Sequence, residues 1–95
     1  MTVEEIQRIV CGYFGIRLAD LKSRRRHRAV SFPRMIAMYI SRQRLGTSYP
    51  ELGERFGGKD HTTVISAVRK ISGLVEDQDE RVLGAVGAIE RKLGI

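Results

Sequence analysis

Hydrophobic residues recur along this chain at helical spacing rather than at the alternating spacing of strands. The clearest stripe falls at i, i+3, i+4 and i+7 in the segment 60–72, which is one face of an amphipathic helix. Its members are Val64, Ala67, Val68 and Ile71. Since no segment shows strand alternation, the pattern predicts an all-α protein built as a small cluster of about five to six helices.

Capping residues and glycines predict where the first elements begin and end. Thr2 and Glu5 match a capping box that opens a first helix, and Gly15 is expected to end it. Residues 18–21 suffice for a single helical turn. The arginine-rich segment 22–28 has no apolar periodicity and is predicted to be a loop.

Two longer helices are predicted on either side of the chain's middle. Ser31 is expected to cap a third helix, with Pro33 in its first turn and Gly46 at its end. A last helix is predicted at about 79–93. Its expected buried residues are Leu83, Val86, Ile89 and Leu93.

Between these helices, residues at about 48–72 have the proportions of a helix-turn-helix. Ser48 and Glu51 form a second capping pattern, which opens a short helix. Gly57 and Gly58 break that helix and can adopt the left-handed conformation of a tight turn. The amphipathic helix that follows is the predicted recognition helix, which would enter a DNA major groove.

The side of this helix opposite the apolar stripe carries short hydroxyls and cations. Its outward and flanking residues are His61, Thr62, Thr63, Ser66, Arg69 and Lys70. Such side chains can hydrogen-bond base edges or phosphates. Asp60 is expected to cap the helix by accepting from the Thr63 backbone, to contact a base, or to do both.

Basic residues are concentrated in one third of the chain. The net charge is +6, and residues 17–45 contain nine Lys or Arg against Asp20 as the only acid. This distribution favours a polyanionic partner, either nucleic acid or an anionic membrane surface, over a solvated basic surface.

Length and composition limit the remaining possibilities. Ninety-five residues correspond to one domain, predicted to span 1–95. The longest apolar run is far too short for a membrane span, and the acidic N-terminus lacks a secretory pattern. A single cysteine, Cys11, fits a reducing compartment. We therefore expect a cytoplasmic, nucleoid-associated protein.

No catalytic, metal or cofactor site is predicted. Residues 53–59 match the first part of a phosphate-binding loop, but Asp60 stands where a Ser or Thr is needed to hold magnesium. His61 and Ser66 share one helix without facing each other, and His27 and Cys11 are too distant in sequence to support a zinc site. We expect no enzyme activity and no small-molecule substrate.

The motif residues resemble a known family. The run 56–64, Phe-Gly-Gly-Lys-Asp-His-Thr-Thr-Val, followed by Arg69-Lys70-Ile71, is similar to the signature of the C-terminal DNA-binding domain of the bacterial replication initiator DnaA. The resemblance extends over Ala19-Asp20-Leu21, residues 23–26, Pro33-Arg34 with Ala37-Met38, and residues 50–53. It implies a helix-turn-helix fold of the TrpR and DnaA C-terminal type.

The resemblance also implies DNA contacts, residue by residue. The residues that would contact bases in the major groove are Asp60, His61, Thr62 and Thr63. Arg26 would enter the adjacent minor groove from the basic loop. The resemblance places Arg34, Arg42, Tyr49, Pro50 and Lys59 on phosphates, and we expect the basic residues Arg25, Arg28 and Arg69 to join them. The target would be the asymmetric DnaA box of TTATNCACA type, in initiation and regulation of chromosomal replication.

Several alternatives stay open. The chain is either the DNA-binding domain of an initiator or a stand-alone DnaA-box regulator without an ATPase domain, and ATP and Mg²⁺ would matter only if that domain is present elsewhere. Further initiator copies or replication proteins would bind through such absent domains. A basic interaction module for anionic lipid or acidic protein is a different class of function. RNA binding is disfavoured because aromatic residues are few and not clustered.

Overall fold

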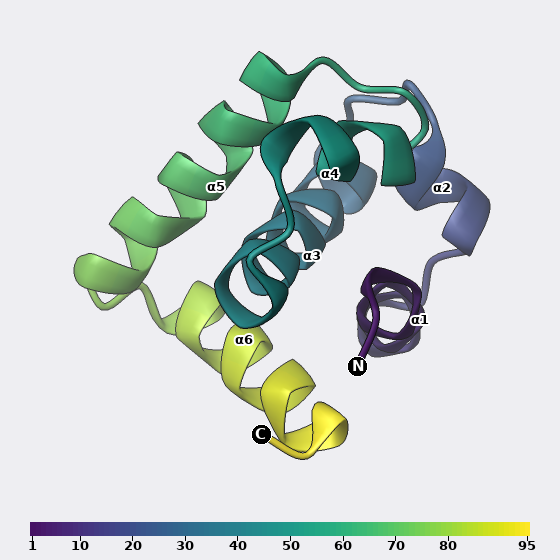
Figure 1. Cartoon of the computed structure of the whole chain (residues 1–95). Helices are drawn as coiled ribbons and strands as arrows, with labels where there is room; N and C mark the ends of the chain where they lie inside the picture. The colour runs from purple at the N-terminus through teal and green to yellow at the C-terminus, as the bar shows by residue number, and fades with distance from the viewer.

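The computed structural model describes all of residues 1–95 and contains helices only (Figure 1). The six helices are α1 (Val3–Phe14), α2 (Leu18–Lys22), α3 (Arg28–Leu45), α4 (Tyr49–Arg55), α5 (His61–Glu76) and α6 (Glu80–Leu93). The prediction of an all-α helical cluster is therefore confirmed. None of these helices combines the length and the apolar character that crossing a membrane would require.

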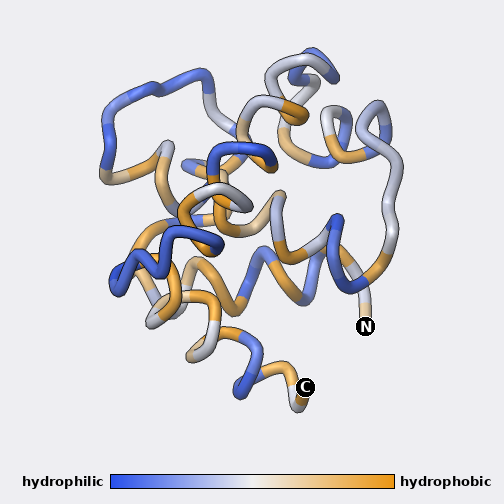
Figure 2. Tube along the Cα trace, turned by 90° about the vertical axis from the view of Figure 1, so that its left-hand side faces the viewer, coloured by the Kyte–Doolittle hydropathy of each residue, from blue (hydrophilic) through white to orange (hydrophobic).

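Helix α3 occupies the centre of the molecule and packs against all five other helices. In Figure 1 it passes behind α4, with α5 on one side and α1 and α2 on the other. This position explains why its middle is buried almost completely, at Ile36, Ala37, Met38 and Ile40. Figure 2 shows hydrophobic and hydrophilic segments alternating along the helices, as expected where each buries one face.

Most of the predicted helix ends are confirmed. The Thr2 hydroxyl accepts a hydrogen bond from the Glu5 backbone at 3.1 Å, and Gly15 ends α1 in the left-handed conformation. Ser48 likewise caps α4 through the Glu51 backbone, at 3.3 Å. These caps satisfy backbone N–H groups that a helix start leaves without partners.

Helix α3 begins one turn earlier than predicted. Its N-cap is His27 rather than Ser31, so Pro33 lies inside the helix. The earlier start brings Val30 into the buried face of the helix. Pro33 leaves the carbonyl of Ala29 without its helical donor, and the exposed position of Ala29 allows water to replace it.

The last two helices also differ from the prediction in detail. Helix α5 continues to Glu76 instead of ending near 72, because Leu74 and Val75 still pack on the core. In α6 the buried stripe begins at Val82, which is 1% exposed, whereas Leu83 is 37% exposed. The predicted burial of Leu83 is therefore wrong: the face turned to the core is rotated by one residue at this end of the helix.

Candidate nucleic-acid interface

A groove lies between the basic loop, defined here as residues 23–27, and the N-terminal part of α5. Its lining comes from the loop, one side of α3, the turn between α4 and α5, and α5 itself. The charged residues of the lining are Arg24, Arg26, Arg34, Lys59, Asp60 and Lys70. With five cations and one carboxylate, the groove is suited to an anionic ligand.

The turn between α4 and α5 depends on glycine. Gly57 and Gly58 have φ values of 89° and 76°, in the left-handed region. A Cβ on Gly57 would collide with the carbonyl oxygen of Lys22 at the end of α2. A Cβ on Gly53 in α4 would collide with that of Lys59. The turn therefore packs backbone to backbone against the residue that precedes the basic loop.

Asp60 caps α5, as predicted, but through a different partner. Its Oδ1 accepts from the backbone N–H and from the hydroxyl of Thr62, both at 2.8 Å, rather than from the backbone of Thr63. The Thr63 N–H donates instead to the Asp60 carbonyl. The hydrogen bonds from Thr62, the backbone one above all, lower the pKa of the Asp60 carboxyl below its usual value.

The two sides of α5 are divided as predicted. The stripe Val64, Ala67, Val68 and Ile71 is buried. The opposite side is exposed at His61, Thr62, Thr63, Ser66, Arg69 and Lys70. Thr63, Ser66 and Lys70 line the groove, whereas His61 and Thr62 lie beyond its edge at the start of the helix. The helix thus presents short polar side chains and an N-terminus on the same side as the basic loop.

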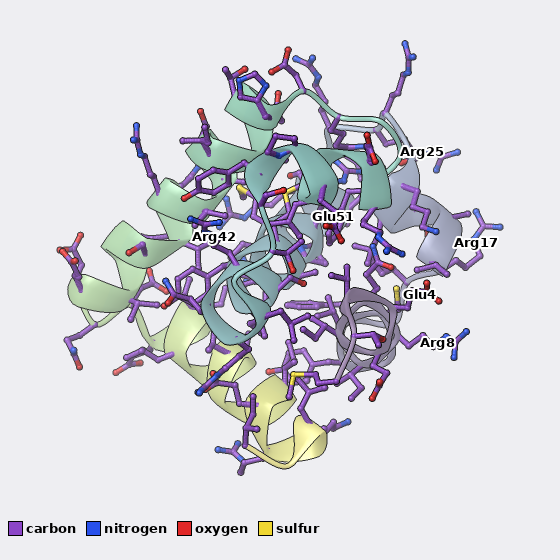
Figure 3. The ribbon with its side chains drawn as sticks, in the orientation of Figure 1. Glu4, Arg8, Arg17, Arg25, Arg42 and Glu51 are labelled. Atoms are coloured by element: carbon purple, nitrogen blue, oxygen red, sulfur yellow. The ribbon has the colours of Figure 1, made fainter.

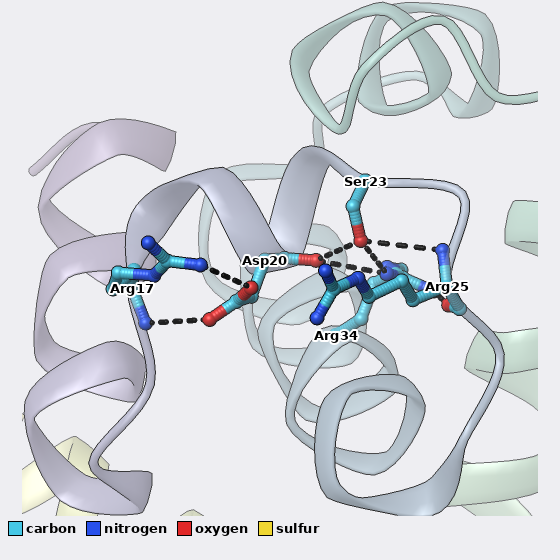
Figure 4. Close-up of polar contacts among 5 residues, drawn as sticks. All are labelled: Arg17, Asp20, Ser23, Arg25 and Arg34. Carbon is cyan, nitrogen blue, oxygen red and sulfur yellow. Dashed lines mark hydrogen bonds and ion pairs between the residues drawn. The ribbon is translucent and has the colours of Figure 1, made fainter.

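Arg34 has a location that the sequence did not predict. It is 7% exposed and donates four hydrogen bonds within the chain, of which Figure 4 shows those to Asp20, Ser23 and Arg25. Nε donates to the Leu21 carbonyl, Nη1 to that of Arg25, and Nη2 to that of Asp20, all at 2.9 Å. Nη2 also donates to the Ser23 hydroxyl at 3.3 Å. Burial lowers the pKa of Arg34 from its usual value.

Lys59 binds the same loop from the turn between α4 and α5. Its Nζ donates to the carbonyls of Ser23 and Phe56, both at 2.7 Å. Partial burial lowers the pKa of this ammonium group, and the nearby charges of Arg34 and Arg24 lower it further. The predicted phosphate contacts of Arg34 and Lys59 therefore compete with hydrogen bonds that both side chains already make to the protein.

A second polar region lies at the start of α4. The guanidinium carbon of Arg42 is 4.2 Å from the centre of the Tyr49 ring, and its Nη1 donates to the Thr47 carbonyl at 3.0 Å. Figure 3 shows Arg42 beside α4. Pro50 is exposed in the first turn of the same helix. Stacking holds the arginine in place beside the first turn of α4, where Pro50 has no N–H and the Glu51 N–H already donates to Ser48, so the guanidinium is the group that this position offers to an anion.

The three remaining predicted phosphate contacts lie outside the groove lining. Arg25 is exposed on the loop and projects toward solvent (Figure 3). Arg69 is exposed on α5. The guanidinium carbon of Arg28 is 5.4 Å from the centre of the Phe32 ring, which it shares with Arg81 at 4.3 Å.

Comparison with known proteins agrees with this geometry. The family model described as the bacterial DnaA protein helix-turn-helix matches residues 3–71. The chain belongs to this family. Its members are DNA-binding helix-turn-helix domains.

A curated relative supports the same assignment. The chromosomal replication initiator protein DnaA of Zymomonas mobilis is 51% identical over 80 residues, which cover 83% of this chain. The aligned residues make up 16% of that protein's length. The comparison therefore concerns one part of a much longer initiator.

Part of the groove in this DnaA-family chain is lined by residues that the sequence did not predict. Met35 and Met38 line it from α3, together with Ser31, which was predicted to be a cap. Their spacing with Arg34 places all four residues on one side of α3. This periodicity is a signal for the groove once α3 is taken to start at Arg28. The role of Ser23 has no such local signal, because its partners Arg34 and Lys59 are distant in sequence.

Proposed function

We propose that this chain binds double-stranded DNA in a sequence-specific manner, at DnaA-box sites of TTATNCACA type. The observation that supports the proposal is the shared groove, which brings the arginines of the basic loop and the start of α5 to one side of the molecule. Adjacent major and minor grooves of a duplex are separated by a single sugar-phosphate strand. One protein surface with a helix and a basic loop side by side can therefore engage both.

In this proposal α5 enters the major groove through its first turn. Asp60, His61, Thr62 and Thr63 would contact bases there. Only one oxygen of Asp60 is used as the cap, so Oδ2 is free to accept from a base amino group such as cytosine N4. The Thr63 methyl group suits contact with a thymine methyl, and the positive end of the helix dipole faces the DNA.

The basic loop would bind in the minor groove of the DNA. Arg26 is exposed and lines the groove of the protein from the loop side. An A·T-rich minor groove is narrow and has an enhanced negative potential, which attracts an inserted arginine. This assigns the A·T-rich end of the box to the loop and the other end to α5.

Phosphate contacts would surround these two elements. Arg42, stacked on Tyr49, lies with Pro50 at the start of α4, where a backbone phosphate would meet its guanidinium. We propose Arg25, Arg28 and Arg69 as outer phosphate contacts, since each is an exposed cation on the loop, α3 or α5.

We further propose that this DNA binding serves the initiation or regulation of chromosomal replication, as the name of the relative suggests. In an initiator, a separate ATPase domain would bind ATP and Mg²⁺ and other copies of the protein. A stand-alone regulator would use the same DNA site without them. Both forms require recognition of the box by the residues described above.

Fluorescence anisotropy with a labelled DnaA-box duplex and a scrambled duplex tests the proposal. At physiological salt the box should bind on the order of 10³-fold more tightly than the scrambled duplex. Arg26→Met should remove much of this preference. Equal affinities would contradict sequence-specific recognition. Co-sedimentation with anionic vesicles provides the opposing measurement, since strong binding there together with equal DNA affinities would favour the lipid-binding class.

A further inference from the structure

Two cations in the groove direct their hydrogen bonds at the protein backbone, and both act at the start of the basic loop. From α3, Arg34 donates to the hydroxyl of Ser23. From the turn before α5, Lys59 donates to the carbonyl of Ser23. Ser23 is thereby held from two sides. Its hydroxyl also donates to the Asp20 carbonyl at 2.8 Å and accepts from the Arg25 backbone at 3.2 Å.

Neither cation has a carboxylate partner. The only acceptors of Arg34 and Lys59 are backbone carbonyls and one hydroxyl. Desolvating two neighbouring cations without a counter-ion has an unfavourable free energy. The hydrogen bonds that the two side chains make to the protein must offset this cost. They connect the loop and α3, which follow each other in sequence, to the turn before α5, where Lys59 lies 36 residues beyond Ser23.

The backbone reinforces the same connection. The carbonyl of Lys22, immediately before Ser23, lies against Gly57 so closely that no other residue fits there. Two residues further along the chain, Lys59 makes its bond back to Ser23. The turn that precedes α5 is therefore joined to the start of the loop both by packing and by a hydrogen bond.

We infer that Arg34 and Lys59 are positioning residues that fix the offset between the basic loop and α5. This inference rests on the proposed function, in which the two elements occupy adjacent DNA grooves. The offset would then set which base pairs Arg26 contacts when α5 is seated in the major groove. The two residues would determine the register between the A·T-rich end of the box and the end recognised by α5.

This role differs measurably from a direct phosphate contact. Losing a phosphate contact weakens binding to all sequences alike and lowers the salt dependence by about 0.9 units of slope per contact. Losing a positioning residue should instead remove discrimination at the bases under the loop. Discrimination at the bases under α5 should stay, because the α5 cap and buried stripe do not involve Lys59.

The first experiment needs no DNA. Trypsin cleavage within residues 24–28, followed by mass spectrometry, reports how well the loop is held. Lys59→Met should speed cleavage at these arginines by about tenfold or more, since cleavage follows the population of the open loop. Lys70→Met removes the same charge from the exposed side of α5 and should leave the rate unchanged. Unchanged cleavage in Lys59→Met would overturn the inference, whether or not the protein binds a DnaA box.

The second experiment measures the affinity of each variant for the box and for two altered boxes. One carries G·C pairs under the loop and the other a changed base under α5. Lys59→Met should lose about tenfold of discrimination against the first and none against the second, with its salt slope unchanged. Lys59→Arg, which keeps a long cationic donor, should restore discrimination.

Lys70 is an exposed cation that lines the groove, and we expect it to contact a phosphate; Lys70→Met is again the matched control and should weaken binding to all three duplexes alike, with a lower salt slope. The same uniform pattern in Lys59→Met would show a phosphate contact and contradict positioning. If Lys59→Met does not fold, retained discrimination in Arg34→Lys would contradict it instead, because a lysine cannot span the carbonyls that the guanidinium fork connects. Failure of the proposed function would show separately, as equal affinity of the unchanged chain for all duplexes.

Discussion

Helix α5 and the basic loop face the same groove, but they are held in place by different means. The start of α5 is fixed by a neighbour in sequence, since Asp60 accepts from Thr62 two residues away. Ser23 makes local hydrogen bonds to Asp20 and Arg25, but the loop is held against the rest of the molecule by side chains 9 to 36 residues away, on α3 and on the turn before α5. One element is organised locally and the other by the tertiary structure.

This difference indicates how each element can fail. A helix with its own cap and apolar stripe tolerates changes elsewhere, because most of its hydrogen bonds are internal. A loop without regular structure must have its carbonyls satisfied from outside. Substitutions at Arg34 or at the turn should therefore affect the loop strongly, whereas substitutions on the exposed side of α5 should affect DNA recognition without unfolding the protein.

The largest effect is expected from Arg34→Met, which removes the charge but keeps much of the side-chain volume. It leaves the carbonyls of Leu21 and Arg25 without their donor and removes one of the donors to the Asp20 carbonyl, and we expect a loss of about 4 kcal/mol of unfolding free energy. Urea unfolding followed by circular dichroism measures this loss. Arg44→Met is the control, because its ion pair with Glu90 is partly exposed and should contribute less than about 1 kcal/mol. Similar losses in the two variants would show that Arg34 does not organise the loop.

A smaller loss is expected from Gly57→Ala, which tests the backbone contact between the turn and the loop. The added Cβ meets the Lys22 carbonyl and also requires a φ of 89°, so unfolding should become easier by about 3 kcal/mol. Gly58→Ala has a similar φ but open space around it, and should cost about 1 kcal/mol. Comparing the thermal unfolding of the two variants separates the effect of the contact with the Lys22 carbonyl from the effect of the positive φ. Equal losses would mean that the close approach at Gly57 is unimportant.

The same contrast explains what could be predicted from the sequence. Local signals sufficed to predict α5, because its cap and its apolar stripe lie within a dozen residues of one another. They also sufficed to predict the caps Thr2 and Ser48. The family resemblance named some of the residues that line the groove, among them Arg26, Asp60 and Thr63, but not Met35 or Met38. Neither source indicated that Arg34 is buried beneath the loop, because an arginine's partners depend on which backbone carbonyls the fold brings to it. Ser31 differs, because its place in the groove follows from the start of α3 at Arg28, one turn before the capping pattern predicted.

On the exposed side of α5, Thr63→Ala should change recognition without changing stability. Thr63 is exposed and lines the groove, so its loss should cost about 2 kcal/mol of binding free energy on the box and little on a scrambled duplex. Ser72→Ala lies further along α5, outside the groove lining, and should have no effect. Anisotropy titrations measure both. An equal loss on the two duplexes would assign Thr63 to the DNA backbone instead of the bases.

The smallest effect is expected from the α5 cap, and it depends on pH. Hydrogen bonding to Thr62 lowers the pKa of Asp60, so the carboxylate favours the folded state above the unfolded carboxyl's pKa of about 4. This contribution is lost as the pH falls through the lower pKa of the folded state. The melting temperature of Asp60→Ala should therefore lie below that of the unchanged chain at pH 7, and the difference should shrink in acid.

Asp60→Ser separates capping from charge at this position, because a serine hydroxyl also accepts at a helix start but does not titrate. At pH 7 the melting temperature of Asp60→Ser should lie close to that of the unchanged chain, and it should change less with pH. The dependence that remains would include Asp20, whose pKa is lowered chiefly by the Arg17 backbone N–H at the start of α2 (Figure 4). If Asp60→Ser melts like the unchanged chain yet loses its preference for the box, the carboxylate contacts a base as well as capping the helix. If it keeps that preference, Asp60 serves α5 as a cap alone, and sequence recognition by this helix rests on the residues that follow it.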